Sequence, residues 1–195
     1  MINTKEKLKA VLKYEKSKYY VSSGKKINII GRIKFKYGEK GIIWKYQNNL
    51  RKWEYCLNKN KKILKYFYMY KTKKSGLKYG LNISPNTFGQ GLHIMHLGSI
   101  LVNDNVRVGN DCSIHINTAI VAGGNNSATP KVGNGVIIGI GATLLGDIEI
   151  ADNIAIGAGS VVNKSFTEPN IAIAGVPAKK ISDNGAQTWR DINKN

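Results

Sequence analysis

An aliphatic residue recurs every six positions from Val102 to Val162. The only exception, Asn126, falls in the polar run 123–129, and the period resumes unchanged at Val132, which predicts a loop extruded from a regular coil. A second series, two positions earlier, holds small or aliphatic residues such as Cys112 and Ser160. The ten aliphatic members of the first series are Val102, Val108, Ile114, Ile120, Val132, Ile138, Leu144, Ile150, Ile156 and Val162.

A period of six matches neither a helix of about 3.6 residues per turn nor strands joined by long connections. It predicts a parallel β-helix whose coils have three flat sides, with the aliphatic residue inward and the small residue at the corner. A β-sandwich would instead place turns about every 8–12 residues, which fits less well. Glycine follows the aliphatic residue at positions 109, 133, 139 and 157, where we expect backbone angles that other residues avoid.

Charge divides the 195-residue chain near Gly80. Residues 1–80 contain 23 Lys and Arg against 4 Asp and Glu, whereas residues 81–195 contain 7 against 8. All 10 tyrosines also lie in the first part. We therefore expect a basic helical domain over 1–80, a β-helix domain over 81–181 with an extruded loop at 123–130, and a tail over 182–195.

The basic part has the apolar spacing of helices. One helix is predicted through Leu8 to Tyr19, and a second from Ile43 to Leu57, where apolar residues step by three and four. A third is predicted through Ile63 to Met69, ending near Gly76. The glycine-containing segment 24–41 predicts a loop with a short strand at 33–35.

Several classes of protein are disfavoured by composition. No run of apolar residues approaches the ~18 of a membrane span, and the segment from Met1 to Tyr20 lacks the apolar stretch of a secretory signal. Cys56 and Cys112 lie far apart in unlike surroundings, so we expect neither a disulfide framework nor a cysteine zinc site. We therefore expect a cytoplasmic protein.

Three motifs resemble the hexapeptide-repeat acyltransferases, which form a left-handed β-helix: IGIGATLLGDIEI at 138–150, IGAGSVV at 156–162 and AGVPAKKI at 174–181. Together with GLHIMHLGSILVND at 91–104, they look like the serine acetyltransferase branch. The segments IIWKYQ and LRKWEY in the helical part look more like acetyltransferases of bacterial surface-polysaccharide pathways. The resemblance implies acetyl-CoA as co-substrate and a homotrimer with its sites between subunits.

Transfer of an acetyl group to a hydroxyl needs a base that titrates near neutral pH. Only His93, His96 and His115 have such an ordinary pKa. By the six-residue count, His96 takes the inward position before Val102, where an unpaired imidazole would be costly. Either the coil shifts register and His96 turns outward, or the ring finds a partner. The resemblance implies His96 as the catalytic base.

The chain departs from serine acetyltransferases at positions that matter. That branch has an Asp which orients the catalytic imidazole, and here Asn82 stands in its place, without a negative charge. Met95 and the pair Thr129 and Pro130 replace an Asp and a His-Pro that help to bind serine. We therefore expect the acceptor to be a sugar hydroxyl of a bacterial surface polysaccharide or its precursor. The alternatives are serine O-acetyltransferase and a non-catalytic ligand-binding β-helix.

The remaining candidate residues are predicted to contact the acceptor or CoA. His115 follows His96 by close to one full coil, so the two rings are expected to approach each other. A zinc-binding β-helix carbonic anhydrase fits less well, and no metal is expected. The predicted acceptor contacts are His93, Asp104, His115 and Asn117. The resemblance implies CoA contacts at Ile140, Gly141, Ala158, Gly159, Lys179 and Lys180, the two lysines meeting the CoA phosphates.

The basic half leaves two interpretations open. Lysine outnumbers arginine 26 to 4, whereas sequence-specific readers of nucleic acid favour arginine, so no nucleic-acid partner is expected. The lysines are either solvated helix faces or a contact to an anionic glycan or to the inner face of a membrane.

Overall fold

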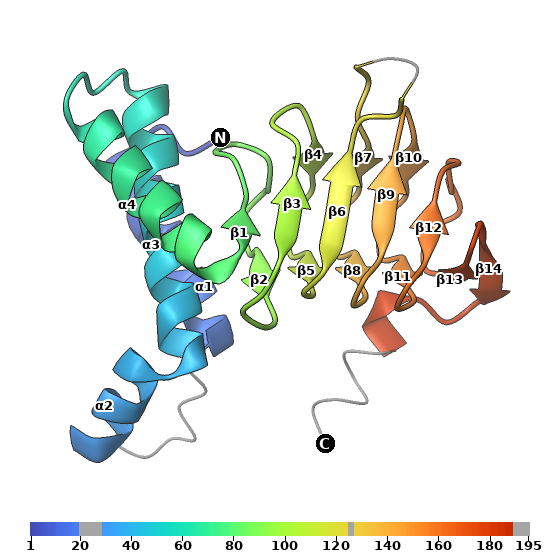
Figure 1. The fold of residues 1–195 in the computed structure, drawn as a ribbon, viewed down its shortest axis with the longest axis horizontal. Coiled ribbons are helices and arrows are strands. Elements are labelled where there is room, and N and C mark those ends of the chain that lie inside the picture. The colour runs from blue at the N-terminus through green and yellow to red at the C-terminus, as the bar shows by residue number, and fades with distance from the viewer. Residues whose placement is uncertain (20–28, 125–126, 189–195) are drawn as a thin grey trace. The chain divides into compact units, whose positions relative to one another are not determined.

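A computed structural model describes residues 1–19, 29–124 and 127–188. The chain divides into two compact units, Met1–Gly80 and Leu81–Asn195. The first unit is built of helices and the second of short strands (Figure 1). None of the helices in the described part of the chain is long and apolar enough to cross a membrane.

The helical unit is organised around one long central helix. Its four helices are α1 (Lys5–Tyr19), α2 (Ile29–Tyr37), α3 (Glu39–Asn58) and α4 (Leu64–Tyr79), and α3 contacts the other three. Ile43, Tyr46 and Leu50 of α3 are fully buried, which confirms most of the predicted apolar stripe. Leu57, at the end of that stripe, is 42% exposed, so the buried face turns away from it.

The loop predicted over 24–41, with a strand at 33–35, is wrong where the structure describes it, and residues 24–28 lie outside the described range. Helix α2 occupies 29–37 and α3 begins at Glu39. Gly38 separates the two helices, but Gly41 lies inside α3, where a Cβ would overlap the carbonyl group of Phe35. Gly41 is thus there for close helix packing, which a sequence pattern does not distinguish from a loop.

Helix α4 continues one turn past its predicted end at Gly76. It ends at Gly80, which adopts the left-handed conformation (φ 75°) and donates its N–H to the carbonyl of Gly76. This is the usual arrangement of a C-terminal glycine cap, and Gly76 is a buried residue inside the helix.

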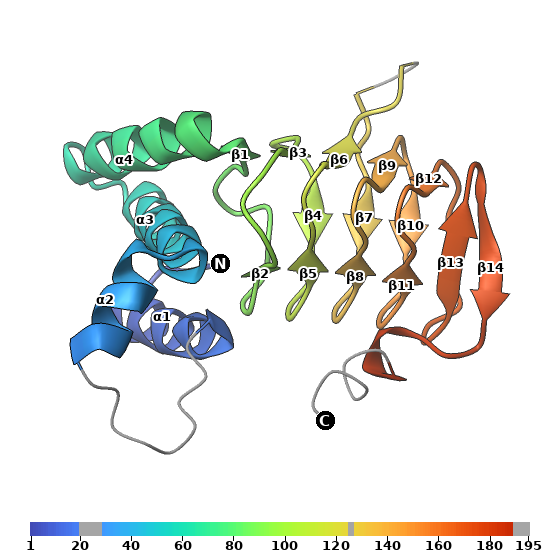
Figure 2. The same cartoon turned by 60° about the horizontal axis from the view of Figure 1, so that its bottom comes forward.

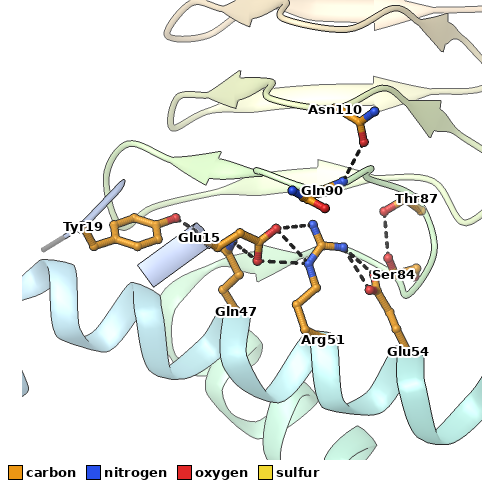
Figure 3. A network of polar contacts seen from close by, with 9 residues as sticks. All are labelled: Glu15, Tyr19, Gln47, Arg51, Glu54, Ser84, Thr87, Gln90 and Asn110. Atoms are coloured by element: carbon orange, nitrogen blue, oxygen red, sulfur yellow. Dashed lines mark hydrogen bonds and ion pairs between the residues drawn. The ribbon is translucent and has the colours of Figure 1, made fainter. Parts of the chain in front are cut away.

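A buried ionic network joins α1 to α3 (Figure 3). Arg51 is 1% exposed and its guanidinium lies 2.6 Å from the carboxylate of Glu15 and 2.9 Å from that of Glu54. Gln47 donates to Glu15, and the hydroxyl of Tyr19 donates to Gln47. Burial alone lowers the pKa of Arg51, but Glu54 and Glu15 outweigh it and raise this pKa above its usual value. The guanidinium therefore stays charged and holds both carboxylates in the interior.

The second unit is a left-handed parallel β-helix with three faces, which confirms the predicted fold class. One face is a five-stranded sheet of β1 (Leu81–Asn82), β3 (Ile100–Val102), β6 (Thr118–Val121), β9 (Thr143–Leu145) and β12 (Val161–Val162). A three-stranded sheet contains β4 (Arg107–Val108), β7 (Lys131–Val132) and β10 (Glu149–Ile150). The third face has β2 (His93–Ile94), β5 (Ser113–Ile114), β8 (Ile137–Ile138), β11 (Ala155–Ile156), β13 (Ala172–Gly175) and β14 (Ala178–Ser182).

The coils stack one beside the next, and all the strand pairs are parallel except the closing β13 and β14 pair (Figure 2). The ten aliphatic residues of the six-residue series are all buried. On the three-stranded face Lys131 pairs both with Glu149, one regular coil later, and with Arg107, before the extruded loop. The coil with the extruded loop is longer than the regular one by one full six-residue repeat, so the period resumes in phase at Val132. Asn126 lies outside the described residues.

The four glycines that follow aliphatic residues do not adopt the backbone angles we expected. None of them has a positive φ. A Cβ at Gly109 would instead come within 2.7 Å of the backbone of Asn134 in the next coil. Side chains stack along this edge: the N–H of Gln90 donates to Asn110 Oδ1 (Figure 3), and the N–H of Asn110 donates to Asn134 Oδ1. Glycine is required here because successive coils approach each other closely.

Gly109→Ala is expected to lower the free energy of unfolding of the β-helix by ~1–3 kcal/mol, since the added methyl group meets backbone that cannot move aside. Gly124→Ala is the matched control, because a Cβ there meets nothing within 4 Å. Chemical denaturation of both variants measures the difference. Equal stability of the two variants would contradict the steric explanation.

Candidate active site

One edge of the β-helix carries most of the predicted site residues. The edge is formed where the chain turns from the six-stranded face to the five-stranded face, after β2, β5, β8 and β11 (the lower turns in Figure 1). Four successive coils contribute to it. The predicted residues that lie on this edge are His96, His115, Asn117, Ile140, Gly141, Ala158 and Gly159.

Backbone hydrogen bonds tie these turns into one ladder. The N–H of Asn117 donates to the carbonyl of Ser99 (2.5 Å), and the N–H of Gly159 donates to that of Ile140 (2.7 Å). Asn117, Gly141 and Gly159 all have left-handed φ angles, between 60° and 71°. The repeated corner conformation accounts for asparagine at 117 and glycine at the two other corners.

The turn that carries His96 is two residues longer than the others. Ile94 pairs with Ile114 and Val102 pairs with Ile120, so a step of eight in the first coil corresponds to a step of six in the next. Ile94 therefore takes the inward position that the six-residue count gave to His96, and His96 is exposed. Of the two possibilities left open by the sequence, the structure has the shifted register with His96 turned outward.

Gly98, in the same turn, is not among the predicted site residues. A Cβ at Gly98 would lie 2.9 Å from the side chain of Ile116, so the absence of a side chain lets the longer turn pack on the next coil. The sequence does contain a signal for the two extra residues of this turn. Ile94 and Ile100 fit the second six-residue series, whereas His96 interrupts the first, aliphatic series.

His96 and His115 lie side by side, with ring centroids 6.3 Å apart. His115 is half-buried. Burial lowers the pKa of His115, and a positive charge on His96 lowers it further. His115 thus stays neutral near pH 7, beside the exposed ring of His96. The pair has the chemistry of a general base beside a neutral imidazole.

His115→Gln is expected to reduce the loss of stability on mild acidification. The pKa of His115 in the fold lies below its ordinary value of 6.5, so the unfolded chain binds a proton first as the pH falls through that value. The contribution of His115 to stability is complete above pH 6.5 and declines below it. Melting temperatures at about pH 7.5 and about pH 5.5 measure this. If the melting temperatures of the wild type and the variant fall equally between these two pH values, His115 does not cause the loss of stability in acid.

The predicted orienting residue Asn82 and the other predicted acceptor contacts lie in different places. His93 is half-buried in β2 on the six-stranded face. Asn82 is exposed in β1 and pairs with Leu101 on the five-stranded face. Asp104 follows β3, at the opposite edge of that face from His96, and accepts a hydrogen bond from the hydroxyl of Ser84. The structure therefore separates Asp104 from the edge that holds the two histidines.

The two lysines of the closing motif differ in their partners. Lys180 in β14 forms ion pairs with Glu168 (2.6 Å) and Asp183 (2.7 Å). Hydrogen bonds to Asp183 and Glu168 raise the pKa of Lys180. Lys179 is exposed and has no carboxylate partner in the described part of the chain. Of the two, Lys179 is the ammonium group available to an anionic ligand.

A wide groove lies elsewhere, on the three-stranded face beside the extruded loop. It encloses about 900 Å³ and its lining includes Arg107, Thr129, Lys131 and Glu149. None of the predicted catalytic or CoA-binding residues lines it. Across the residues that the structure describes, no group of three or more His, Cys, Asp or Glu side chains is placed to hold a metal ion.

Comparisons with known proteins show which proteins this chain resembles. The family model described as "Bacterial transferase hexapeptide (six repeats)" matches residues 129–164. Serine acetyltransferase of Buchnera aphidicola is 33% identical over 132 residues, covering 66% of this chain and 47% of that protein. Serine acetyltransferase of Haemophilus influenzae is 35% identical over 144 residues, covering 72% and 52%. The chain spans about half the length of these curated relatives.

Solved structures of serine acetyltransferases are also similar to this chain. Serine acetyltransferase of Brucella abortus in complex with coenzyme A has a TM-score of 0.69 at 26% identity, covering 93% of this chain and 70% of that chain. Serine acetyltransferase of Neisseria gonorrhoeae in complex with serine has a TM-score of 0.66 at 26% identity, covering 91% and 70%. The chain is a hexapeptide-repeat protein of left-handed β-helix fold. Its resemblance to the serine acetyltransferase branch, predicted from the sequence, is confirmed.

These comparisons overturn the predicted acceptor. We expected a sugar hydroxyl of a surface polysaccharide. Asn82 replaces the Asp that orients the imidazole in the serine acetyltransferase branch, and Met95 and Thr129 replace residues that help to bind serine there. The relatives and solved structures named above are instead serine acetyltransferases. The predicted sugar acceptor is therefore not supported, and the comparisons favour the serine alternative.

Proposed function

We propose that this protein is an acetyl-CoA-dependent serine O-acetyltransferase with His96 as general base. The observation that carries the proposal is the edge of the β-helix on which exposed His96 lies beside His115, with the corners at Gly141 and Gly159 in the coils that follow. Support comes from the similarity to serine acetyltransferases that were solved with coenzyme A and with serine.

In the proposed reaction, the imidazole of His96 accepts the proton of the serine hydroxyl as the oxygen attacks the carbonyl carbon of the acetyl thioester. The tetrahedral intermediate then expels the thiolate of CoA, which receives the proton from the imidazolium. His115 stays neutral because burial and His96 lower its pKa. A neutral neighbour does not oppose the transient positive charge on His96, which favours proton transfer to that ring.

The CoA arm is proposed to run along the same edge. Gly141 and Gly159 carry no side chain, and Ile140 and Ala158 are exposed, so an extended chain can approach the backbone there. Lys179 is the better candidate for a phosphate contact, because the charge of Lys180 is already shared between Glu168 and Asp183.

Among the predicted acceptor contacts, His115 and Asn117 share the edge with His96, and they are proposed to contact serine. His93 on the adjoining strand is proposed to line the same pocket. Asn82 is proposed to orient His96 by hydrogen bonding, as an amide can fix an imidazole tautomer. Asp104, at the opposite edge, remains a proposed acceptor contact only if a neighbouring subunit brings it to the site.

A homotrimer with sites between subunits is part of the proposal, since the edge is open and a second surface would complete a cleft. Sedimentation analysis of the purified protein is expected to give three times the mass of the chain, and a monomer would contradict this. We also infer that the protein acts in the cytoplasm, where acetyl-CoA is produced.

The function is tested by the release of CoA thiol from acetyl-CoA on addition of L-serine. We expect turnover with L-serine and none with L-alanine, which has the same ammonium and carboxylate groups but no hydroxyl. Calorimetry with CoA is run in parallel. Binding of CoA without turnover on L-serine would indicate a non-catalytic binding protein and would contradict the proposal.

A further inference from the structure

The helical unit contains a groove whose charge the proposed acetyl transfer does not use. It lies between α2, α3 and α4 and encloses about 530 Å³, within the size range of small-molecule sites. A second hollow of about 320 Å³ adjoins it and shares Lys36, Lys45, Asn49 and Lys71 with it. The residues that line the larger hollow include five lysines, Lys36, Lys45, Lys71, Lys74 and Lys78.

Helical periodicity explains why so many lysines meet at one place. Lys71, Lys74 and Lys78 are spaced at i, i+3 and i+7 on α4, so they lie on one face, together with Ser75. Lys45 and Asn49 are spaced at i and i+4 on α3 and face the same groove. The three α4 lysines extend over about 10 Å along the helix axis. The groove therefore has a row of lysines along one wall. Their ammonium groups lie over neighbouring rings, Lys71 over Phe67, Lys74 over Tyr70 and Lys78 over Tyr79.

In the part of the chain that the structure describes, no carboxylate pairs with this row. Within the described residues, none of the five lysines forms an ion pair, and no Asp or Glu lines either hollow. The helical unit has only four acidic residues, Glu6, Glu15, Glu39 and Glu54. Two of them, Glu15 and Glu54, pair with Arg51 in the core and are 0% and 2% exposed. The lysines of the groove repel one another, so a bound anion would stabilise them.

We propose that this groove binds a small polyphosphate, a ligand with two or more adjacent phosphate groups such as that of a nucleoside polyphosphate. Five ammonium groups around one hollow match several phosphates held close together, and each lysine acts as a point charge that needs no fixed geometry. Asn49 and Ser75 add uncharged donors on the same walls.

A small ligand fits better than a membrane or a nucleic acid. The lysines line a recess of ligand size, so a compact polyanion contacts several of them at once. A flat bilayer surface or a long nucleic acid would contact the exposed lysines from outside without filling the recess. Tyr37 and Tyr79 also line the groove, and Lys36 and Lys78 lie over their rings.

The test is calorimetric titration of the full chain with inorganic tripolyphosphate, with ATP and with sulfate. We expect tripolyphosphate and ATP to bind with one site per chain and an affinity that falls with added salt, and sulfate to bind far more weakly. Tighter binding of ATP than of tripolyphosphate would add the nucleoside to the ligand. No binding of either polyphosphate would overturn the proposal.

Matched charge variants locate the site. Lys71→Gln, Lys74→Gln and Lys78→Gln combined are expected to weaken tripolyphosphate binding at least about tenfold. Lys5→Gln, Lys9→Gln and Lys13→Gln combined remove the same charge from exposed positions of α1 and are expected to leave it unchanged. Equal effects of the two triple variants would show unspecific attraction and reject the groove.

Two further experiments test a membrane and a nucleic acid as alternative ligands. Vesicles containing phosphatidylserine and a single-stranded oligonucleotide are tested by co-sedimentation and by fluorescence anisotropy. Binding of either one without binding of tripolyphosphate would refute the small-ligand site. Acetyl transfer to L-serine is measured separately on the same variants, so a failure of the groove and a failure of the proposed function are told apart.

Discussion

His96→Ala is expected to lower the turnover of acetyl-CoA with L-serine by about 100- to 10 000-fold, the usual contribution of a positioned general base. His96 is the proposed base because its ring is exposed, whereas burial lowers the pKa of its neighbour His115. CoA binding is expected to be unchanged, since the proposed CoA contacts come from later coils. The measurement is the rate of thiol release at saturating L-serine.

His93→Ala is the comparison variant, because His93 lies three positions earlier and is half-buried in β2. We expect a smaller loss there, seen mainly in the Michaelis constant for serine. Melting temperatures of both variants show that the fold is intact. Unchanged turnover in folded His96→Ala, or a loss confined to His93→Ala, would remove His96 from the mechanism.

Arg51→Met is expected to lower the free energy of unfolding of the helical unit by ~3–5 kcal/mol, because a buried ion pair is broken on one side only. The substitution keeps most of the side-chain volume but leaves Glu15 and Glu54 buried without a counter-charge, which costs far more than the lost ion pairs. Urea denaturation followed by the helical signal in circular dichroism measures the effect.

Lys131→Met is the matched control in the same chain. Lys131 pairs with Glu149, but the two side chains are 67% and 61% exposed, so we expect a change of only ~0–1 kcal/mol. Combining Arg51→Met with Glu15→Leu and Glu54→Leu is expected to restore much of the loss, because no buried charge remains. Equal stability of Arg51→Met and the wild type would show that the network carries no net penalty when broken.

The β-helix could be predicted because its core is a strict sequence period. Every coil must bury a similar residue at the same place, so the ten aliphatic residues were visible in the sequence and are all buried. The reason for the glycines was not visible, since a close approach between coils depends on residues one whole coil away. Gly109 is therefore explained by Asn134 and not by its own backbone angles.

The helical unit was less accessible to sequence reasoning. Glycine at 38 and 41 was interpreted as a loop, although one separates two helices and the other permits their contact. The buried network was missed because Glu15 and Arg51 resemble solvated residues of lysine-rich helices. Only tertiary packing places them together, 36 residues apart in the chain.

For the candidate site, the sequence predicted most of the residues on the β-helix edge, but not the two extra residues in the turn that carries His96. His96 was recognised as a residue that breaks the pattern, while the two extra residues that turn it outward became visible only from the pairing of Ile94 and Val102. The acceptor was predicted wrongly, because the replacements at Asn82 and Met95 were weighed more heavily than similarity over the whole domain.

The most direct test of the central claim is identification of the product formed from L-serine and acetyl-CoA labelled with carbon-13 in the acetyl group. We predict that mass spectrometry will show O-acetyl-L-serine carrying the label, formed by the wild type and reduced at least about a hundredfold with His96→Ala. Absence of labelled acetylserine from a folded wild-type protein that binds CoA would contradict the assignment of this edge as a serine O-acetyltransferase site.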